Sequence, residues 1–289
     1  MIQEKSDNKP VSLSVGIIGC GWLGKALADS LLPAGKLVLA TSSKQENIEK
    51  LNQLGIKAQQ LTLPTDDKQF SQHDVFAQQS LVIAITPKFK QGQTDYADKI
   101  AQVVHAAQQR GLVQRIILLS STAVYQGLTG KIDEQSALNL TSQKAQMLKA
   151  AEQAVLDFSK HLSKHVSNQG VVLRLAGLVG PERHPGKFLL ASKTLTNAKA
   201  PVNLIHQQDA VGLIESLLSA ESAEGIFNGV SDTHVSKEQY YQAAAKSLSL
   251  PTPDFSPHQS DEITRVVCGE KAKQRLNYKF IYPDLLSWL

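Results

Sequence analysis

Two stretches of the chain carry groups whose types and spacing could do chemistry. Residues 120–127 read SSTAVYQG, so two serines, a threonine and a tyrosine follow the apolar run IILL directly. Residues 16–24 read GIIGCGWLG, in which Gly19, Gly21 and Gly24 give the spacing G-x-G-x-x-G. Hydroxyls at the end of a buried strand can bind a substrate oxygen, and glycines at this spacing can admit a phosphate to the backbone.

The glycine motif has the sequence context of a dinucleotide-binding turn. It follows the apolar run SVGIIGC and opens a segment with Leu23, Leu27 and Leu31 at helical spacing. In such a turn the first glycine makes the tight bend, the second lets the backbone approach a pyrophosphate, and the third lets helix and strand pack closely. The N–H groups of Trp22 and Leu23 would then bind the phosphates. The alternative is a turn whose glycines serve packing alone.

The segment about 20 residues beyond the glycine turn bears on which dinucleotide would bind. A carboxylate there would hold a ribose 2′-hydroxyl and favour NAD, but the segment reads ATSSKQE and its apolar run ends without an acid. The hydroxyls of Ser42 and Ser43 and the ammonium of Lys44 could accept a 2′-phosphate. The prediction is NADP(H), with NAD as the alternative, since Lys44 could equally begin a solvated helix.

Strands and helices are predicted to alternate around these motifs. Apolar runs predict strands at 14–20, 37–40, 56–64, 80–85, 115–120 and 171–177, and helical spacing predicts helices at 22–32, 44–54, 95–110 and 141–163. This alternation predicts an α/β fold with a Rossmann-type, doubly wound parallel sheet. Ligands bind at the carboxyl ends of the strands in such sheets, so Thr86 and Ser120, at the ends of two apolar runs, are expected to contact the cofactor.

The pattern changes after Gly177, where prolines interrupt the chain repeatedly. Helices are predicted near 209–220, with Asp209 as N-cap, and near 237–249, on either side of the strand-like GIFNGV. The expected organisation is a flexible tail at 1–12, a dinucleotide-binding Rossmann domain at 13–177, and a smaller C-terminal substrate-binding region at 178–289 with some elements returning to the sheet.

Composition excludes several classes of function. The 289 residues include 30 Lys and Arg and 26 Asp and Glu, scattered without a long run of one charge, so no nucleic-acid partner is expected. The two cysteines match neither a disulfide framework nor a zinc-site spacing, so no metal is expected. The polar N-terminus is not a signal peptide, and no apolar run reaches the roughly 18–20 residues that span a bilayer. We expect a cytoplasmic protein with a small-molecule substrate and no membrane partner, and a homodimer is compatible with the sequence.

The order of these motifs resembles the extended short-chain dehydrogenases/reductases, in the NAD-dependent epimerase/dehydratase superfamily. The resemblance runs from about residue 14 to the end and rests on the glycine turn, SSTAVYQG, LRLAGLVGP, VNLIHQQDAVGLI and the closing KAKQRLNYKFIYPDLLSWL. The segment RLAGLVGPERHPGKF resembles in particular the atypical, YeeZ-type bacterial group. The resemblance implies a Rossmann fold, a nicotinamide cofactor and oxidoreductase-like chemistry.

The resemblance also implies a catalytic set that this chain only half contains. In the family, a Ser or Thr after the fifth strand bonds the substrate oxygen, and a Tyr-x-x-x-Lys pair on the next helix moves the proton and holds the nicotinamide ribose. The lysine is needed because an unperturbed tyrosine titrates near pH 10. Ser121, four residues before Tyr125, matches the Ser/Thr position. The next helix reads LNLTSQKAQMLKAAE, with Lys144 at the tyrosine position and Leu148 at the lysine position.

Three interpretations remain open. The first is an NAD(P)-dependent oxidoreductase that acts on a small carbonyl, alcohol or sugar-like substrate, with a rearranged site in which Lys144 or Tyr125 moves the proton beside Ser121. The second is a non-catalytic, dinucleotide-binding sensor or regulatory protein. The third is a nucleotide-sugar epimerase or dehydratase, which ranks last because that chemistry needs the missing tyrosine most directly.

Three further residues are predicted substrate contacts. Thr122 adjoins Ser121 and could take its place if the register differs by one residue. Arg183 and His184, in PERHPGKF, could together bind a carboxylate or phosphate. The alternative for this pair is an exposed loop shaped by its two prolines.

Overall fold

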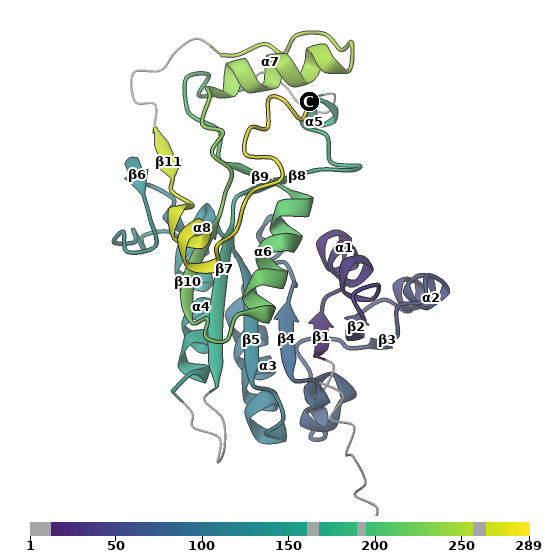
Figure 1. Cartoon of the computed structure of the whole chain (residues 1–289). Helices are drawn as coiled ribbons and strands as arrows, with labels where there is room; N and C mark the ends of the chain where they lie inside the picture. Colours follow the sequence, from purple (N-terminus) through teal and green to yellow (C-terminus); the bar gives the residue numbers. More distant parts are fainter. Residues whose placement is uncertain (1–12, 161–167, 190–194, 257–263) are drawn as a thin grey trace, which may run out of the picture.

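The computed structural model describes residues 13–160, 168–189, 195–256 and 264–289, so the predicted tail at 1–12 and the predicted helix end near 163 lie outside the described residues. Its centre is a seven-stranded sheet of order β10-β7-β5-β4-β1-β2-β3, in which every neighbouring pair is parallel (Figure 1). The strands are β1 (Ser14–Ile18), β2 (Leu37–Ser42), β3 (Ala58–Gln60), β4 (Ser80–Ile83), β5 (Arg115–Ser121), β7 (Gln169–Leu175) and β10 (Gly225–Gly229). The predicted Rossmann-type, doubly wound sheet is confirmed.

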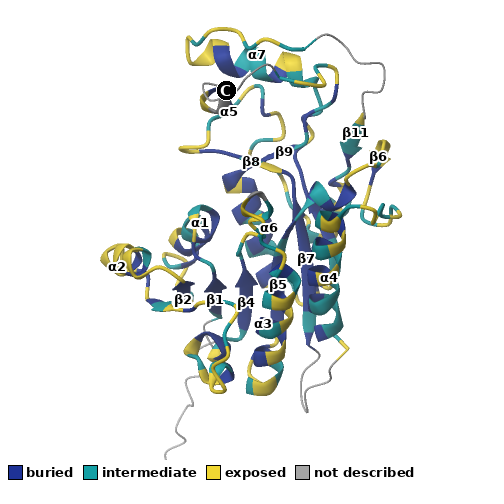
Figure 2. Ribbon diagram, turned by 180° about the vertical axis from the view of Figure 1, so that it is seen from behind, coloured by how far each residue is buried: buried dark blue, intermediate teal, exposed yellow. Residues whose placement is uncertain are grey.

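Helices cover both faces of this sheet, and its central strands are buried between them (Figure 2). On one face α1 packs against α6, and on the other α3 packs against α4. The helices are α1 (Trp22–Leu31), α2 (Gln45–Gln53), α3 (Tyr96–Arg110), α4 (Gln143–Phe158), α5 (Pro185–Leu189), α6 (Gln207–Ser219), α7 (Lys237–Ser247) and α8 (Glu270–Leu276). Apolar residues at helical spacing explain the packing, as on α3, where Ile100, Val103 and Ala107 are buried together.

The ends of the helices show which local predictions hold. Ser142 caps α4 through its Oγ, which accepts a hydrogen bond from the Ala145 N–H at 3.2 Å, as its residue type predicts. The predicted cap of α6 is wrong: His206 caps the helix, and its Nδ1 accepts from the Gln208 N–H at 3.2 Å. Asp209 is fully buried and instead holds the C-terminal segment, accepting from the backbone of Ile281 and Tyr282.

The chain beyond residue 177 contributes both to the sheet and to a smaller lobe over its carboxyl end (Figure 1). It supplies β10 and α6 to the central layers, and its short strand β8 (Gly177–Val179) pairs with β9 (Leu204–His206). Strand β11 (Arg265–Val267) pairs with β6 (Gly130–Ile132). A second apolar core, which includes Val179, Tyr240 and Leu285, lies in this lobe. The domain boundary at 177 stays a prediction.

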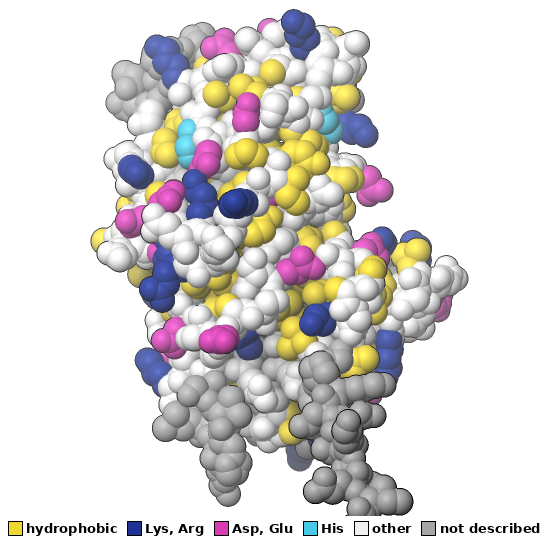
Figure 3. Space-filling view, in the orientation of Figure 1, with side chains coloured by type: hydrophobic (Ala, Val, Ile, Leu, Met, Phe, Trp, Pro, Cys, Tyr) yellow, Lys and Arg dark blue, Asp and Glu magenta, His cyan; other side chains and the backbone are white. Residues whose placement is uncertain are grey.

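The surface and the helix lengths add two observations. On the face in Figure 3, Lys and Arg are interspersed with Asp and Glu, and apolar side chains gather where the smaller lobe meets the body of the protein. Among the described residues, no helix has both the length and the apolar character needed to cross a membrane.

A buried polar network ties the carboxyl ends of the strands together. Glu152 on α4 and Arg174 on β7 are 0% and 1% exposed, and Arg174 donates to both carboxylate oxygens, at 3.0 and 2.6 Å. Ser120 at the end of β5 donates to the same carboxylate at 2.6 Å. Arg174 also donates to the Tyr125 phenol at 2.8 Å, and that phenol donates to Asn228 on β10 at 2.9 Å. Four elements of the fold therefore meet at one ion pair.

Because each charge would be left without its partner in the core, we expect Glu152→Met and Arg174→Met to lower the free energy of unfolding by about 3–5 kcal/mol each. The double variant should lose no more than half of the sum of the two single losses in unfolding free energy, since no buried charge remains. Urea unfolding followed by circular dichroism measures all three. Asp29→Asn, which breaks the exposed Lys25–Asp29 pair, is the control and should change stability by less than about 0.5 kcal/mol. Additive losses in the double variant would show that the pair is not coupled.

Candidate functional site

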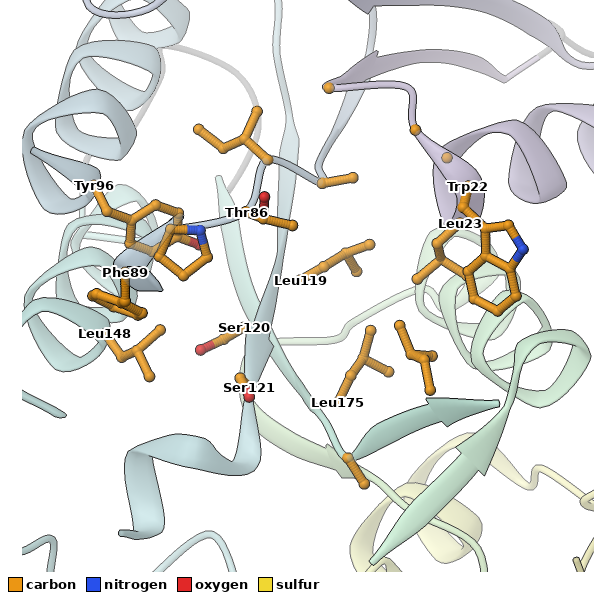
Figure 4. Close-up of a pocket in the computed structure, with 18 of the residues that line it drawn as sticks. Trp22, Leu23, Thr86, Phe89, Tyr96, Leu119, Ser120, Ser121, Leu148 and Leu175 are labelled. Atoms are coloured by element: carbon orange, nitrogen blue, oxygen red, sulfur yellow. The ribbon is translucent and has the colours of Figure 1, made fainter. Parts of the chain in front are cut away.

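A cavity of about 480 Å³ opens at the carboxyl ends of β1, β4 and β5 (Figure 4). It brings together ten residues that the sequence singles out: Gly19, Gly21, Trp22, Leu23, Gly24, Thr86, Ser120, Ser121, Lys144 and Arg183. Its other walls are mostly apolar: Ala84, Ile85, Pro87, Phe89, Tyr96, Leu119, Leu148, Leu175, Ala176 and Leu178. Residues that are distant in sequence, on the glycine turn and in SSTAVYQG, thus line one space.

The glycine turn has the geometry that a bound phosphate needs. Gly19 has φ +86°, and a Cβ there would lie 2.6 Å from Cγ2 of Ile85, so no larger residue fits. A Cβ on Gly21 would meet nothing within 4 Å, which leaves its backbone open to a ligand. Gly21 is also the N-cap of α1 and has no side chain to cap the first N–H groups of the helix. These amides are available to an anion.

The two serines at the end of β5 have opposite hydrogen-bonding roles. Ser120 is 6% exposed and donates its proton to Glu152, so toward the cavity its Oγ can only accept. The half-buried Ser121 Oγ accepts from the Ala123 N–H at 3.1 Å, which leaves its own O–H free to donate. Ser121 is therefore the one of the pair suited to polarise a carbonyl oxygen.

The first turn of α4 places a cation in the cavity. Lys144 is half-buried, and its Nζ lies 5.6 Å from the centre of the Phe89 ring. One turn further on, Leu148 is 1% exposed and presents an apolar wall where the family has its lysine. Lys149 does not line the cavity, and its Nζ donates to Gln153 at 3.1 Å. The cavity thus contains one lysine of this helix, at the tyrosine position.

Two of the predicted site residues in SSTAVYQG do not line the cavity. Thr122 and Tyr125 belong to the short 3₁₀ helix η4 (Thr122–Tyr125), which turns their side chains into the core, where they are 7% and 0% exposed. The Tyr125 phenol is engaged by Arg174 and Asn228, and burial raises its pKa. This environment makes Tyr125 a structural residue, because a buried, bonded and neutral phenol has no access to a substrate.

Of the predicted pair Arg183 and His184, the structure places only Arg183 at the cavity. Arg183 is exposed and lines the cavity, with its guanidinium 4.3 Å from the Trp22 ring. The Trp22 Nε1–H donates to the Pro181 carbonyl at 3.0 Å, so the loop and the glycine turn are joined at the cavity mouth. His184 does not line the cavity and stacks on Trp288 at 5.5 Å. Burial lowers its pKa, which keeps the imidazole neutral near pH 7.

A second cavity, of about 250 Å³, continues the first one past the glycine turn. The two share Gly19, Gly21, Ala84, Ile85 and Thr86. Ser42 and Ser43 line the second cavity, as do Lys88 and Lys99, whereas the exposed Lys44 lines neither cavity. None of the side chains described around it is acidic, although Lys99 is paired with Asp95 at 2.8 Å.

Sequence reasoning missed two residues of the site. Glu152 orients Ser120 from behind, and its buried position on α4 is visible only once Arg174 is placed beside it. Tyr96 brings a phenol into the cavity from α3 and is 2% exposed. The signal for Tyr96 was present in the sequence: it is four residues before Ile100, on the apolar face of its helix.

Comparison with known proteins agrees with this geometry. The family described as "NADP oxidoreductase coenzyme F420-dependent" matches residues 14–87, which contain the glycine turn and the first four strands. A conserved protein of unknown function from Silicibacter pomeroyi DSS superposes with a TM-score of 0.73 at 21% identity, covering 96% of each chain. The Bordetella bronchiseptica enzyme WbmG, solved in complex with NAD, superposes with a TM-score of 0.74 at 18% identity, covering 97% of this chain and 94% of that one.

The similarity in sequence is more specific than the similarity in fold. Protein YeeZ of Escherichia coli (strain K12) is 30% identical over 280 residues, which cover 94% of this chain and 97% of that protein. The alignment therefore includes the glycine turn, the strand-end serines and the smaller lobe together. The chain belongs to the YeeZ-type group of extended short-chain dehydrogenases/reductases, in the NAD-dependent epimerase/dehydratase superfamily, and has the NAD(P)-binding Rossmann fold of that superfamily.

Proposed function

We propose that the protein is an NAD(P)(H)-dependent oxidoreductase that acts on a small carbonyl compound or alcohol through a non-standard proton-transfer site. The observation that carries the proposal is the shared cavity: the open glycine turn, the free hydroxyl of Ser121 and the ammonium of Lys144 all line it. A phosphate-binding turn, a donor for a substrate oxygen and a group able to exchange a proton are the parts that carbonyl reduction requires.

Each part of the site has a separate task in this proposal. The glycine turn and the first N–H groups of α1 would hold the pyrophosphate of a dinucleotide, which would supply or accept the hydride. Ser121 donates a hydrogen bond to the substrate oxygen, where negative charge develops during reduction. Lys144 gives a proton to that oxygen in reduction and removes it in oxidation. Thr122, Tyr125 and His184 have no task in this scheme, because their side chains lie outside the cavity.

The lining of the cavity favours an apolar substrate. Apart from the glycine turn, its walls are built largely from leucine, isoleucine, alanine and aromatic side chains. A nucleotide sugar offers many hydroxyls and a second pyrophosphate, which such walls would leave without partners. An aldehyde, ketone or alcohol with an aliphatic or aromatic body suits the cavity better than the sugar-like substrate that the family also suggests.

One observation favours a second candidate, a dinucleotide-binding sensor without turnover. The Lys144 ammonium lies 5.6 Å from the centre of the Phe89 ring, and Leu148 occupies the position of the family's lysine. A protein that only binds the dinucleotide needs no proton donor, so this arrangement would be sufficient for a sensor. Turnover by the wild type separates the two candidates.

We expect NADPH to bind at least tenfold more tightly than NADH, because the second cavity offers Ser42, Ser43 and lysines but no carboxylate to a 2′-phosphate. Ser43→Asp should place a negative charge there, weaken NADPH binding about tenfold or more, and leave NADH binding unchanged or improved. Isothermal titration calorimetry measures both ligands on both proteins. Tighter binding of NADH to the wild type would refute the preference, and absence of binding of either would refute the proposed function.

We expect Lys144→Met to lower turnover by about 100-fold or more, because the proton donor is lost while the length of the side chain is kept. Ser121→Ala should have an effect of similar size. Lys149→Met, on the same helix but outside the cavity, is the matched control and should stay within about twofold of the wild type. Aldehydes and ketones are screened by the loss of NADPH absorbance. Wild-type turnover that survives in Lys144→Met would remove Lys144 from the mechanism.

A further inference from the structure

Tyr96 is a buried residue whose hydroxyl makes no hydrogen bond to the described residues. The residue is 2% exposed, it lines the 480 Å³ cavity, and its phenol oxygen has no hydrogen-bond partner among the described residues. By contrast, the buried Tyr125 phenol bonds Asn228, and the half-buried Tyr278 phenol bonds Asp209 at 3.0 Å. Burying a hydroxyl without a partner is unfavourable, so a position that faces a cavity in this state points to a ligand atom.

The protonation state of the Tyr96 phenol determines whether it donates a hydrogen bond or acts as a base. Burial raises the pKa of Tyr96, and the nearby charge of Glu152 raises it further. The group therefore stays protonated at physiological pH and acts as a hydrogen-bond donor rather than as a base. Its partner must be an acceptor oxygen or nitrogen on whatever fills the cavity.

The arrangement of the two cavities indicates which part of the dinucleotide comes near. If the N-terminus of α1 held the pyrophosphate, the cavity lined by Ser42 and Ser43 would hold the adenosine half. The cavity that contains Ser120 and Tyr96 would then be left for the nicotinamide half. In Figure 4, Tyr96 lies with Phe89 and Leu148 on the wall opposite Trp22 and Leu23.

Tyr96 and the half-buried Lys144 are the side chains with a donor on this wall of the cavity, and of the two Tyr96 is the buried one. Leu148 and Phe89 have no polar side-chain atoms, and Ser120 is committed as a donor to Glu152. A ribose that passes along this wall would find one buried donor, the Tyr96 phenol, among the described lining residues.

Resting on the proposed function, we propose that Tyr96 binds the nicotinamide-ribose half of the dinucleotide by donating a hydrogen bond to a ribose oxygen. The phenol thereby supplies, from α3, a polar contact that the apolar Leu148 on α4 cannot make. Tyr96 is thus a further cofactor-binding residue, and Ser121 and Lys144 remain free to act on the substrate.

Tyr96→Phe tests this inference, because it removes the hydroxyl and keeps the ring. We expect it to weaken NADPH binding by about threefold to tenfold, the size of one buried hydrogen bond. Binding of adenosine 2′,5′-bisphosphate, which lacks the nicotinamide half, should not change. The melting temperature of the ligand-free protein should stay the same or rise, because the unpartnered hydroxyl is gone. A structural role for the hydroxyl would lower it.

Tyr240→Phe is the matched control. Tyr240 is 0% exposed and its hydroxyl also has no partner among the described residues, but it belongs to the separate core of the smaller lobe. This variant should bind NADPH like the wild type. Unchanged NADPH binding in Tyr96→Phe, or an equal loss for NADPH and the bisphosphate, would overturn the inference while wild-type binding upheld the proposed function. Failure of the wild type to bind NADPH or NADH would overturn both.

Discussion

The ion pair between Glu152 and Arg174 is the constraint on which the carboxyl end of the sheet depends. Both groups are almost fully buried, so each is tolerable in the core only because the other is there. The same carboxylate receives the Ser120 proton, and the same guanidinium reaches Tyr125 and, through it, β10. The orientation of a cavity hydroxyl is thereby coupled to the pairing of α4, β5, β7 and the last strand of the sheet.

The division of polar residues between core and cavity differs from the family's usual catalytic set. The core of the protein uses Tyr125, Glu152 and Arg174 for structure, while the cavity retains Ser121, Lys144 and the phenol of Tyr96. Around these donors and the acceptor Ser120, most of the cavity wall is apolar. Such a set suits a ligand whose few oxygens are acceptors on an otherwise apolar body.

The sequence predicts those parts of the fold that local patterns determine. The periodicity of apolar residues and the strand–turn–helix around the glycines depend on residues within a few positions of one another, and these predictions are confirmed. Contacts between distant segments were not predictable. Asp209 looks like a cap, but its partners lie about 70 residues later, at Ile281 and Tyr282. Tyr125 looks catalytic until Asn228, 103 residues away, is placed beside it.

The glycine turn and the loop after β8 meet at the mouth of the cavity. Arg183 stacks on Trp22 near the surface, and the indole is bonded to Pro181, interactions that together amount to about 1–2 kcal/mol. At that free energy, the two contacts are broken at any moment in roughly a tenth of the molecules. These two contacts can therefore open without unfolding of the smaller lobe. Trp22 is one of the two tryptophans of the chain, so a change in intrinsic fluorescence can report when its contacts with Arg183 and Pro181 break.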